Sequence, residues 1–266
     1  MSVKVLVGTS GYSYGDWVGP VYPSGTAKKD FLSVFSNRFS IVELNFSYYR
    51  QPDAHITGRM VEETDPGFFF AIKAHKSITH TISEDWRTEV AVYRKGIQPL
   101  IVSKRLTAVL LQFPFSFHYE KENRIYLDRV CSELQDLPLV LEFRHADWQA
   151  TRVYHEMRSR NIGLAVADYP ALHNLPKPTP VITSDIGYVR FHGRNAKNWW
   201  GGTNASRYDY LYGSSELDEW VERITGMSRN AKVLVIVFNN HWRGKAAQNA
   251  DELKAKLQKQ KQLDIR

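Results

Sequence analysis

Eight short apolar runs recur along the chain at nearly even intervals, and polar or helix-like segments separate them. The runs are Val3–Val7, Ile41–Phe46, Phe68–Ala74, Leu106–Phe113, Leu139–Phe143, Gly163–Ala167, Tyr188–Gly193 and Lys232–Phe238. Over 266 residues the average spacing is about 33 residues, which is the length of one strand–helix unit. Eight such units without an intervening linker predict a single (β/α)8 TIM-type barrel over residues 1–266.

The segments between the runs carry the spacing of amphipathic helices. In 28–38, Phe31, Val34 and Phe35 fall on one helical face, and similar spacing recurs in 54–63, 120–135, 214–228 and 246–262. The segment 169–185 contains four prolines and predicts little helix. An open, doubly wound sheet is the alternative fold. However, Gly8-Thr-Ser-Gly11 lacks the G-x-G-x-x-G phosphate loop that usually follows the first strand of such a sheet.

Cysteine content and the length of the apolar runs exclude several classes of protein. The single cysteine, Cys131, can form neither an intrachain disulfide nor a cysteine-built zinc site. The apolar runs are far shorter than the roughly 20 residues that span a bilayer, and the first apolar stretch is too short for a signal peptide. We therefore expect a soluble, cytoplasmic protein without a membrane partner. The net charge of +7 owes much to lysines between 254 and 261, so it does not by itself indicate nucleic-acid binding.

Ordered motifs at the ends of the runs resemble those of a known family. They are Gly8-Thr-Ser-Gly-Tyr-Ser-Tyr-Gly-Asp-Trp17, Val42-Glu-Leu-Asn-Phe-Ser-Tyr-Tyr-Arg50, Phe70-Ala-Ile-Lys-Ala-His-Lys76, Leu110-Leu-Gln-Phe-Pro114, Glu142-Phe-Arg-His145, Val189-Arg-Phe-His-Gly193 and Phe238-Asn-Asn-His241. Together they resemble the YecE-like family, catalogued as domain of unknown function 72, over about residues 7–250. The resemblance implies a TIM-type barrel and supplies no reaction, so the activity has to be inferred from the residues.

Polar residues alternate with apolar ones near the carboxyl ends of the predicted strands. Because helices cover the outside of a barrel, the apolar set is expected to face outward and the polar set inward. The inward set comprises Glu43, Asn45, Lys73, His75, Gln112, Glu142, Arg144, Arg190, His192, Arg194 and Asn239, with Asn240 and His241 at the rim. Asp168 has the same parity in its strand as the apolar residues Leu164 and Val166, so alternation alone does not direct its side chain inward.

Two interpretations of this inward set remain open. The buried charges can neutralise one another, for example Glu142 with Arg190 and Glu43 with Lys73, in a purely structural network. Alternatively they form a binding or active site, since the catalytic face of a TIM barrel lies at the carboxyl ends of its strands. Cations outnumber carboxylates in the set, which favours a small anionic ligand.

Aromatic residues concentrate in the segments that follow the strands. Two long loops, 8–25 and 193–213, carry many of them, and the second has the Gly and Asn content of a binding loop or lid. Ser10, Tyr12 and Trp17 lie in the first loop. Aromatic rings at this rim can anchor loops or can stack on bases and sugar rings.

These observations predict an enzyme that acts on a phosphorylated or nucleotide-containing substrate by hydrolysis or general acid–base chemistry. Glu43 or Glu142 is expected to be the base, and His75 or His192 the acid. The expected substrate-binding residues are Ser10, Tyr12, Trp17, Asn45, Lys73, Gln112, Arg144, Asp168, Arg190, Arg194, Asn239, Asn240 and His241.

Other functions stay open at this point. A non-catalytic barrel that binds nucleic acid would use the same basic and aromatic residues. A metal-dependent, endonuclease-like barrel is a further alternative, because five histidines lie near strand ends (His75, His80, His145, His192 and His241). No H-x-H or H-E-x-x-H spacing occurs, so the sequence requires no cofactor and assigns no metal ligand, and a divalent metal stays an alternative. Glycoside hydrolysis by two carboxylates is disfavoured, since strand seven carries His192 instead.

Overall fold

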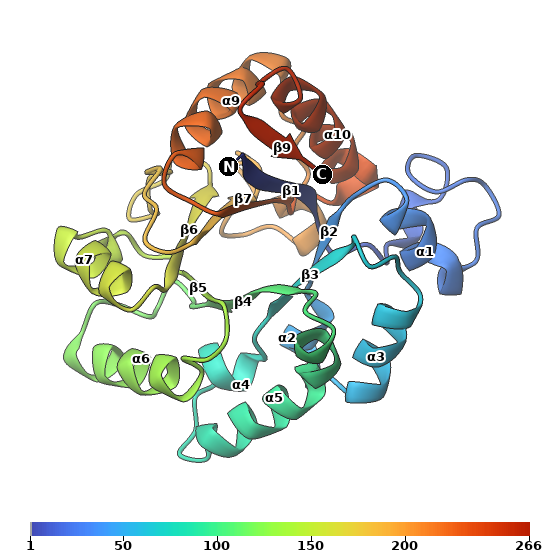
Figure 1. The fold of residues 1–266 in the computed structure, drawn as a ribbon. Coiled ribbons are helices and arrows are strands. Elements are labelled where there is room, and N and C mark those ends of the chain that lie inside the picture. Colours follow the sequence, from blue (N-terminus) through green and yellow to red (C-terminus); the bar gives the residue numbers. More distant parts are fainter. Residues whose placement is uncertain (1) are drawn as a thin grey trace.

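The computed structural model describes residues 2–266, which form a closed barrel of eight parallel strands surrounded by helices (Figure 1). The strands are β1 (Val3–Ser10), β2 (Ile41–Leu44), β3 (Phe69–Lys73), β4 (Leu106–Gln112), β5 (Leu139–Glu142), β6 (Gly163–Asp168), β7 (Ile186–Phe191) and β8 (Val233–Phe238). Each pairs with the next, β8 pairs with β1, and β1 pairs with β2. The predicted (β/α)8 barrel is therefore confirmed.

Helices of very different length connect the strands. They are η1 (Gly15–Trp17), η2 (Lys28–Asp30), α1 (Phe31–Ser36), α2 (Phe46–Tyr49), α3 (Ala54–Glu62), α4 (Lys76–Thr79), α5 (Trp86–Val102), α6 (Lys121–Glu133), η3 (Ala146–Trp148), α7 (Thr151–Ser159), α8 (Asn204–Arg207), α9 (Ser214–Ser228), η4 (Trp242–Gly244) and α10 (Lys245–Leu257). Residues 169–185 contain no helix, as their prolines predict. Local signals fix some boundaries: Asp53 Oδ1 accepts hydrogen bonds from the amides of His55 and Ile56 and so caps α3.

The carboxyl end of the chain differs from the expectation. The predicted helix 246–262 ends at Leu257, and a ninth strand, β9 (Leu263–Ile265), follows it. This strand pairs in parallel with Val3–Val5 of β1, whereas β2 pairs with β1 only over Gly8–Ser10. The short β9 thus fills the seam that β1 and β2 leave open at the amino end of the barrel.

Two apolar layers enclose the barrel wall. The outer layer lies between strands and helices, where Val42 and Leu44 belong to the same buried cluster as Trp220 of α9. The inner layer fills the barrel and includes Leu6, Leu110, Val140, Tyr188 and Val235. Within β2, Val42 and Leu44 therefore face the helices, whereas Ile41 and Glu43 face inward, as alternation predicts.

Helices able to cross a bilayer are absent from the described residues, because none combines sufficient length with sufficient apolar character.

Candidate functional site

An ion-pair network occupies the barrel interior near the carboxyl ends of the strands. At its centre Arg190 donates to both glutamates. Its Nε and Nη2 atoms bond Glu43 Oε2 and Oε1 at 2.9 and 2.6 Å, and its Nη1 atom bonds Glu142 Oε2 at 2.5 Å. All three side chains are at most 2% exposed. The central guanidinium is thus shared between two carboxylates inside a nearly dry barrel.

Hydroxyl groups complete the hydrogen bonding of both carboxylates. Ser10 Oγ donates to Glu43 Oε1, and Tyr188 donates its hydroxyl to Glu43 Oε2 at 2.7 Å. Tyr169 donates its hydroxyl to Glu142 Oε1 at 2.9 Å. With these donors in place, Glu43 and Glu142 have little capacity left to take a proton from a ligand.

Electrostatics keep Glu142 charged and His192 neutral. Burial alone would raise the pKa of Glu142, but Arg190 and Arg144 hold it well below its usual range. Burial, with Arg144 nearby, lowers the pKa of His192 to about 3. The His192 ring stacks on Tyr169, with centroids 5.0 Å apart, and its Nδ1 atom lies 3.0 Å from the amide nitrogen of Asn239. A neutral His192 does not fit the predicted role of an imidazolium acid at neutral pH.

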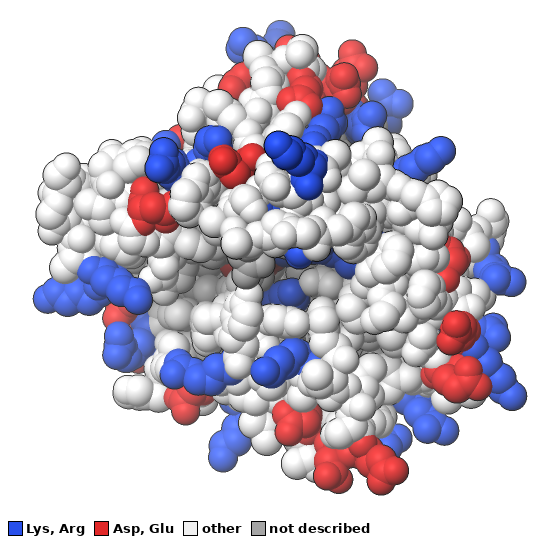
Figure 2. Space-filling view, turned by 180° about the vertical axis from the view of Figure 1, so that it is seen from behind, with Lys and Arg blue, Asp and Glu red and all other residues white. Residues whose placement is uncertain are grey.

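Above this network lies a cavity of about 270 Å³. Its walls come from the segments that follow six strands and are formed by Tyr48, Tyr49, Lys73, His80, Gln112, Pro114, Phe115, Arg144, Leu175, Trp199, Trp200, Arg207 and Tyr208. Figure 2 shows this face of the molecule, which is hollowed near its middle and has basic atoms inside the hollow. Neither Glu43 nor Glu142 lines the cavity, so both predicted bases lie beneath its floor.

Three cations line the cavity, and among the described lining residues there is no carboxylate. Arg144 Nε lies 2.6 Å from Glu142 Oε1, but the angle is not that of a hydrogen bond. The side chain of Arg207 makes no hydrogen bond to any described side chain, and its Nε atom is buried. Two arginines that line the cavity therefore each keep an Nε atom without a hydrogen-bond acceptor among the described residues, and guanidiniums of this kind suit phosphate or carboxylate oxygens.

Lys73 is the third cation of the cavity. Its Nζ atom donates to Gln112 Oε1 at 2.7 Å and lies 4.0 Å from the centre of the Tyr48 ring. Burial is the main cause that lowers its pKa to about 7, and the charges of Arg190 and Arg144 lower it further. Lys73 can therefore gain or lose a proton near neutral pH.

Aromatic rings form much of the remaining wall. Trp199 is buried and packs edge-to-face on Tyr169, with centroids 5.6 Å apart, whereas Trp200 is 56% exposed. Phe115 packs against Trp200 at 4.9 Å. The expected substrate-binding residues did not include Trp199, Trp200, Arg207 or Tyr208. The aromatic content of loop 193–213 was the available signal, but no pattern distinguished Arg207.

Arg194 and Asp168 do not belong to the cavity, and the prediction that Arg194 faces inward is wrong. Arg194 Nε and Nη2 donate to the two oxygens of Asp168 at 2.9 and 2.8 Å, and its Nη1 donates to Glu216 of α9 at 2.7 Å. Trp220 of the same helix donates to Asp168 at 2.7 Å. Gly193, with φ of +85°, breaks the strand alternation and turns Arg194 to the outer side of the barrel.

His75 and Asn240 also lie apart from the cavity, contrary to the prediction that they bind or act on the ligand. His75 Nδ1 accepts from the amide of Ser77 at 3.3 Å and so caps α4, with Glu89 at 3.9 Å. Asn240 is fully buried and donates to the Tyr210 carbonyl at 2.8 Å. Both side chains therefore stabilise loops. Beside the cavity, His80 takes the place expected for His75.

Part of the loop after β1 packs against the rest of the protein and stabilises the fold. Trp17 is fully buried and donates to the His241 carbonyl at 2.8 Å, so the prediction that it contacts ligand is wrong. His241 stacks on Tyr14 at 4.6 Å. Tyr12 and Asn45 line a separate cleft of about 520 Å³, which shares Tyr49 with the cation-lined cavity.

One group of side chains outside the cavity could hold a metal ion. His145 Nδ1 and His118 Nδ1 lie 3.0 and 3.5 Å from the oxygens of Asp147. Nitrogen and carboxylate ligands of this kind suit zinc and related ions. Phe115, with its ring 4.8 Å from that of His145, separates the group from the cavity.

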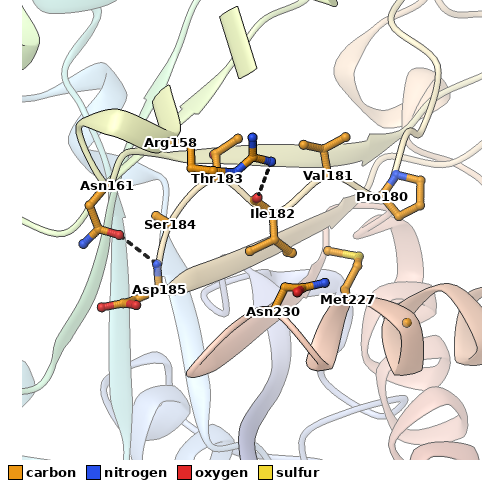
Figure 3. Close-up of a pocket in the computed structure, with 11 residues that line it drawn as sticks. Arg158, Asn161, Pro180, Val181, Ile182, Thr183, Ser184, Asp185, Met227 and Asn230 are labelled. Atoms are coloured by element: carbon orange, nitrogen blue, oxygen red, sulfur yellow. Dashed lines mark hydrogen bonds between the residues drawn. The ribbon is translucent and has the colours of Figure 1, made fainter. Parts of the chain in front are cut away.

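A larger cavity, of about 570 Å³, lies at the opposite end of the barrel (Figure 3). It is lined by residues that precede β6 and β7 and by the end of α9. There Arg158 donates to the Ile182 carbonyl at 3.2 Å, and Asn161 accepts from the Asp185 amide at 3.0 Å. Since the amino ends of barrel strands serve stability, the smaller, cation-lined cavity is the candidate functional site.

Comparisons with known proteins agree with the fold. The family described as "Protein of unknown function DUF72" matches residues 6–265. The UPF0759 protein YunF of Bacillus subtilis (strain 168) is 32% identical over 265 residues, which cover 94% of this chain and 93% of that one. A crystal structure of a DUF72 family protein from Thermotoga maritima MSB8 is similar with a TM-score of 0.88 and 38% identity, covering 96% of this chain and 99% of that one. A second crystal structure of a DUF72 family protein, from Enterococcus faecalis V583, is similar with a TM-score of 0.83 and 27% identity, covering 96% of this chain and 95% of that one.

Proposed function

Because the chain belongs to the DUF72 family, which prescribes no reaction, we propose from its cavity that it is an enzyme acting on a small anionic, phosphorylated substrate. The substrate would lie at the carboxyl ends of the strands, and the chemistry would be hydrolysis or proton transfer. A compact ligand with a sugar or base ring suits the aromatic walls.

The observation that carries this proposal is the charge of the cavity wall. Lys73, Arg144 and Arg207 line it, and among the lining residues that the structure describes no carboxylate opposes them. The guanidinium of Arg207 has no hydrogen-bond partner on any described side chain. Buried donors without partners are costly, so an anion that accepts their hydrogen bonds would stabilise the site.

The size of the cavity favours a small molecule over a nucleic acid. Its volume of about 270 Å³ lies just below the range of roughly 300–1,000 Å³ for small-molecule sites. A duplex or single strand would instead need an open groove with basic flanks.

Lys73 is the group best placed to exchange a proton with the substrate. Glu43 and Glu142 lie beneath the floor and are saturated by hydrogen bonds, so we do not retain them as general bases. Lys73 reaches the cavity and has a pKa of about 7, close to the value at which a general base is most effective. The carboxylates instead hold Arg190 and Arg144 in place.

Binding of phosphorylated probes tests the proposal. Ribose 5-phosphate and adenosine monophosphate should change the fluorescence of Trp199 and Trp200, whereas ribose and adenosine should not. Loss of a charge-assisted hydrogen-bond donor costs about 1.5–3 kcal/mol. Arg207→Gln should therefore weaken binding at least tenfold.

The matched control is Arg94→Gln, which removes an arginine that pairs with Asp136 at 2.7 Å and does not line the cavity. It should leave the affinity unchanged. Equal responses to ribose 5-phosphate and ribose, or equal affinities of the Arg207 and Arg94 variants, would contradict the proposal.

A further inference from the structure

Lys73 has the surroundings of a lysine that reacts through a free amine. Its hydrogen-bond partner is the amide oxygen of Gln112, 2.7 Å from Nζ. Gln112 keeps this orientation because its own Nε2 atom donates to the Phe113 carbonyl at 2.8 Å. No carboxylate oxygen of residues 2–266 lies within 4.0 Å of the amine. The amine therefore has an acceptor that orients it but no counter-ion that would hold it protonated.

The charges around the amine favour its neutral form. The two buried carboxylates, Glu43 and Glu142, are already balanced by the guanidiniums of Arg190 and Arg144. A proton on Lys73 adds a positive charge whose attraction to Glu142 and Glu43 is outweighed by burial and by repulsion from Arg190 and Arg144. Burial, followed by the two guanidiniums, lowers the pKa of Lys73 to about 7, so a large fraction of molecules carries the free amine at neutral pH. The other titratable or charged groups that face the same cavity are Tyr48, Tyr49, His80, Arg207 and Tyr208.

We infer that Lys73 is a nucleophile that forms a Schiff base with an aldehyde or ketone group of the anionic substrate. The inference rests on the proposed function, because Arg144 and Arg207 must hold the anion while the carbonyl meets the amine. Amines of this kind are activated by a desolvated site and by neighbouring cations, and both conditions hold here. The substrate class is therefore a phosphorylated carbonyl compound.

The step balances without an oxidant or reductant. The Nζ lone pair of Lys73 adds to the carbonyl carbon, and one amine proton moves to the carbonyl oxygen, which gives a carbinolamine. A further proton from solvent lets that oxygen leave as water and gives a protonated imine. The imine draws electrons from the adjacent carbon, so the reaction class is proton removal or carbon–carbon cleavage next to the carbonyl.

His80 is a second nitrogen group that lines the cavity beside Lys73. Its ring packs edge-to-face on Tyr48, with centroids 4.8 Å apart, and it lines the same cavity as Lys73. Burial is the main cause that lowers the pKa of His80 to about 4, which leaves the imidazole unprotonated at pH 7. A pKa of about 4 also makes this imidazole a weak base, so it is better suited to accept a hydrogen bond than to remove the proton.

Reductive trapping tests the inference. The probe is pyridoxal 5′-phosphate, which joins an aldehyde, an aromatic ring and a phosphate. Borohydride then reduces the imine to a stable secondary amine, and mass spectrometry of peptides locates it. Lys104 is exposed and serves as the comparison. An unperturbed lysine amine has a pKa near 10.4, so at pH 7 its free-amine fraction is about 10³-fold smaller than that of an amine with a pKa of about 7. Lys73 should therefore be labelled at least ~100-fold faster than Lys104.

Two comparisons show whether the anion matters. Pyridoxal, which lacks the phosphate, should label Lys73 at least ~10-fold more slowly if the guanidiniums hold the anion. Inorganic phosphate should compete with the phosphorylated probe. Faster labelling of Lys73 by pyridoxal than by its phosphate ester would count against the inference.

Two variants are used, so that the test does not depend on the correct folding of one of them. Lys73→Arg removes the nucleophile and should abolish the fast label. Gln112→Glu places a carboxylate 2.7 Å from the amine, keeps the side-chain shape and should raise the pKa of Lys73. Fast labelling should then be lost at pH 7 and should return above pH 9.

The outcomes separate this inference from the proposed function. If inorganic phosphate binds in the cavity but Lys73 is labelled no faster than Lys104, the Schiff base is wrong and the anion site stands. If phosphate does not bind and pyridoxal labels Lys73 as fast as its phosphate ester does, the proposed function fails. Fast, phosphate-dependent labelling of Lys73 that Gln112→Glu shifts to higher pH supports both.

Discussion

Neutralising Glu142 should destabilise the barrel strongly. The substitution Glu142→Gln keeps the shape of the side chain but removes the carboxylate that faces Arg190 Nη1 at 2.5 Å and Arg144 Nε at 2.6 Å. Both partners would keep their charge in a site where Glu142 is 1% exposed. Breaking a buried ion pair by removing one partner costs about 3–5 kcal/mol.

Thermal unfolding followed by circular dichroism measures this cost. A loss of 1 kcal/mol lowers the melting temperature by about 2–4 °C in a chain of this size. Glu142→Gln should therefore lower it by roughly 6–20 °C. The control is Asp136→Asn, which breaks the exposed pair with Arg94 and should cost less than about 1 kcal/mol.

The loss should also depend on pH. Because the folded pKa of Glu142 lies well below its unfolded value, its carboxylate contributes stability above about pH 4.3, and this contribution fades as the pH falls toward the folded pKa. The difference in the free energy of unfolding between the parent protein and Glu142→Gln should therefore be largest at pH 7 and should decrease as the pH falls. A destabilisation below about 1 kcal/mol at pH 7 would refute the view that Arg190 and Arg144 need this counter-ion.

Three further substitutions separate structural from functional residues. In thermal melts, Lys73→Gln should stabilise the protein at pH 6 and have little effect near pH 10. The pKa of Lys73 is lowered from 10.5 to about 7, so the protonated amine destabilises the folded protein below pH 7. This destabilisation decreases as the pH rises from about 7 to 10.5. Asp168→Asn should cost about 3–5 kcal/mol in urea unfolding, since it removes the negative charge that Arg194 faces and turns one of the two acceptor oxygens into an amide donor. Affinity for ribose 5-phosphate should not change, and a loss of binding would contradict the outward placement. Trp200→Ala removes a side chain that is 56% exposed, so it should change stability by less than about 0.5 kcal/mol. It should weaken binding of adenosine monophosphate by about 1–3 kcal/mol in a fluorescence titration if the base stacks on it, and unchanged affinity would exclude that contact.

The barrel itself could be predicted from the sequence, because its period is carried by many residues at once. Apolar alternation located all eight strands and placed Glu43 and Arg190 on the inner face. Helices with weaker patterns were missed: α5 contains Pro99, and α7 buries only Val153 and Met157. The strand β9 was missed as well, since three residues carry too little periodicity to mark a strand.

The site was harder to predict where strands give way to loops. Alternation stops at a residue such as Gly193, whose positive φ sends Arg194 to the outer side of the barrel. His75 bonds a backbone amide two residues away, and Trp17 bonds the carbonyl of His241 at the other end of the chain. No spacing in the sequence reveals either contact. Arg207 reaches the cavity from α8 in the middle of a long loop, so its place depends on tertiary structure alone.

The central claim is that the cation-lined cavity binds an anion, and a crystal structure of the protein soaked in inorganic phosphate tests it most directly. The account predicts tetrahedral density in the cavity within hydrogen-bond distance, about 2.7–3.2 Å, of the guanidiniums of Arg144 and Arg207. The same density should be absent from Arg207→Gln crystals soaked in the same way. A cavity that stays free of phosphate in the parent protein, or equal density in the variant, would contradict the claim.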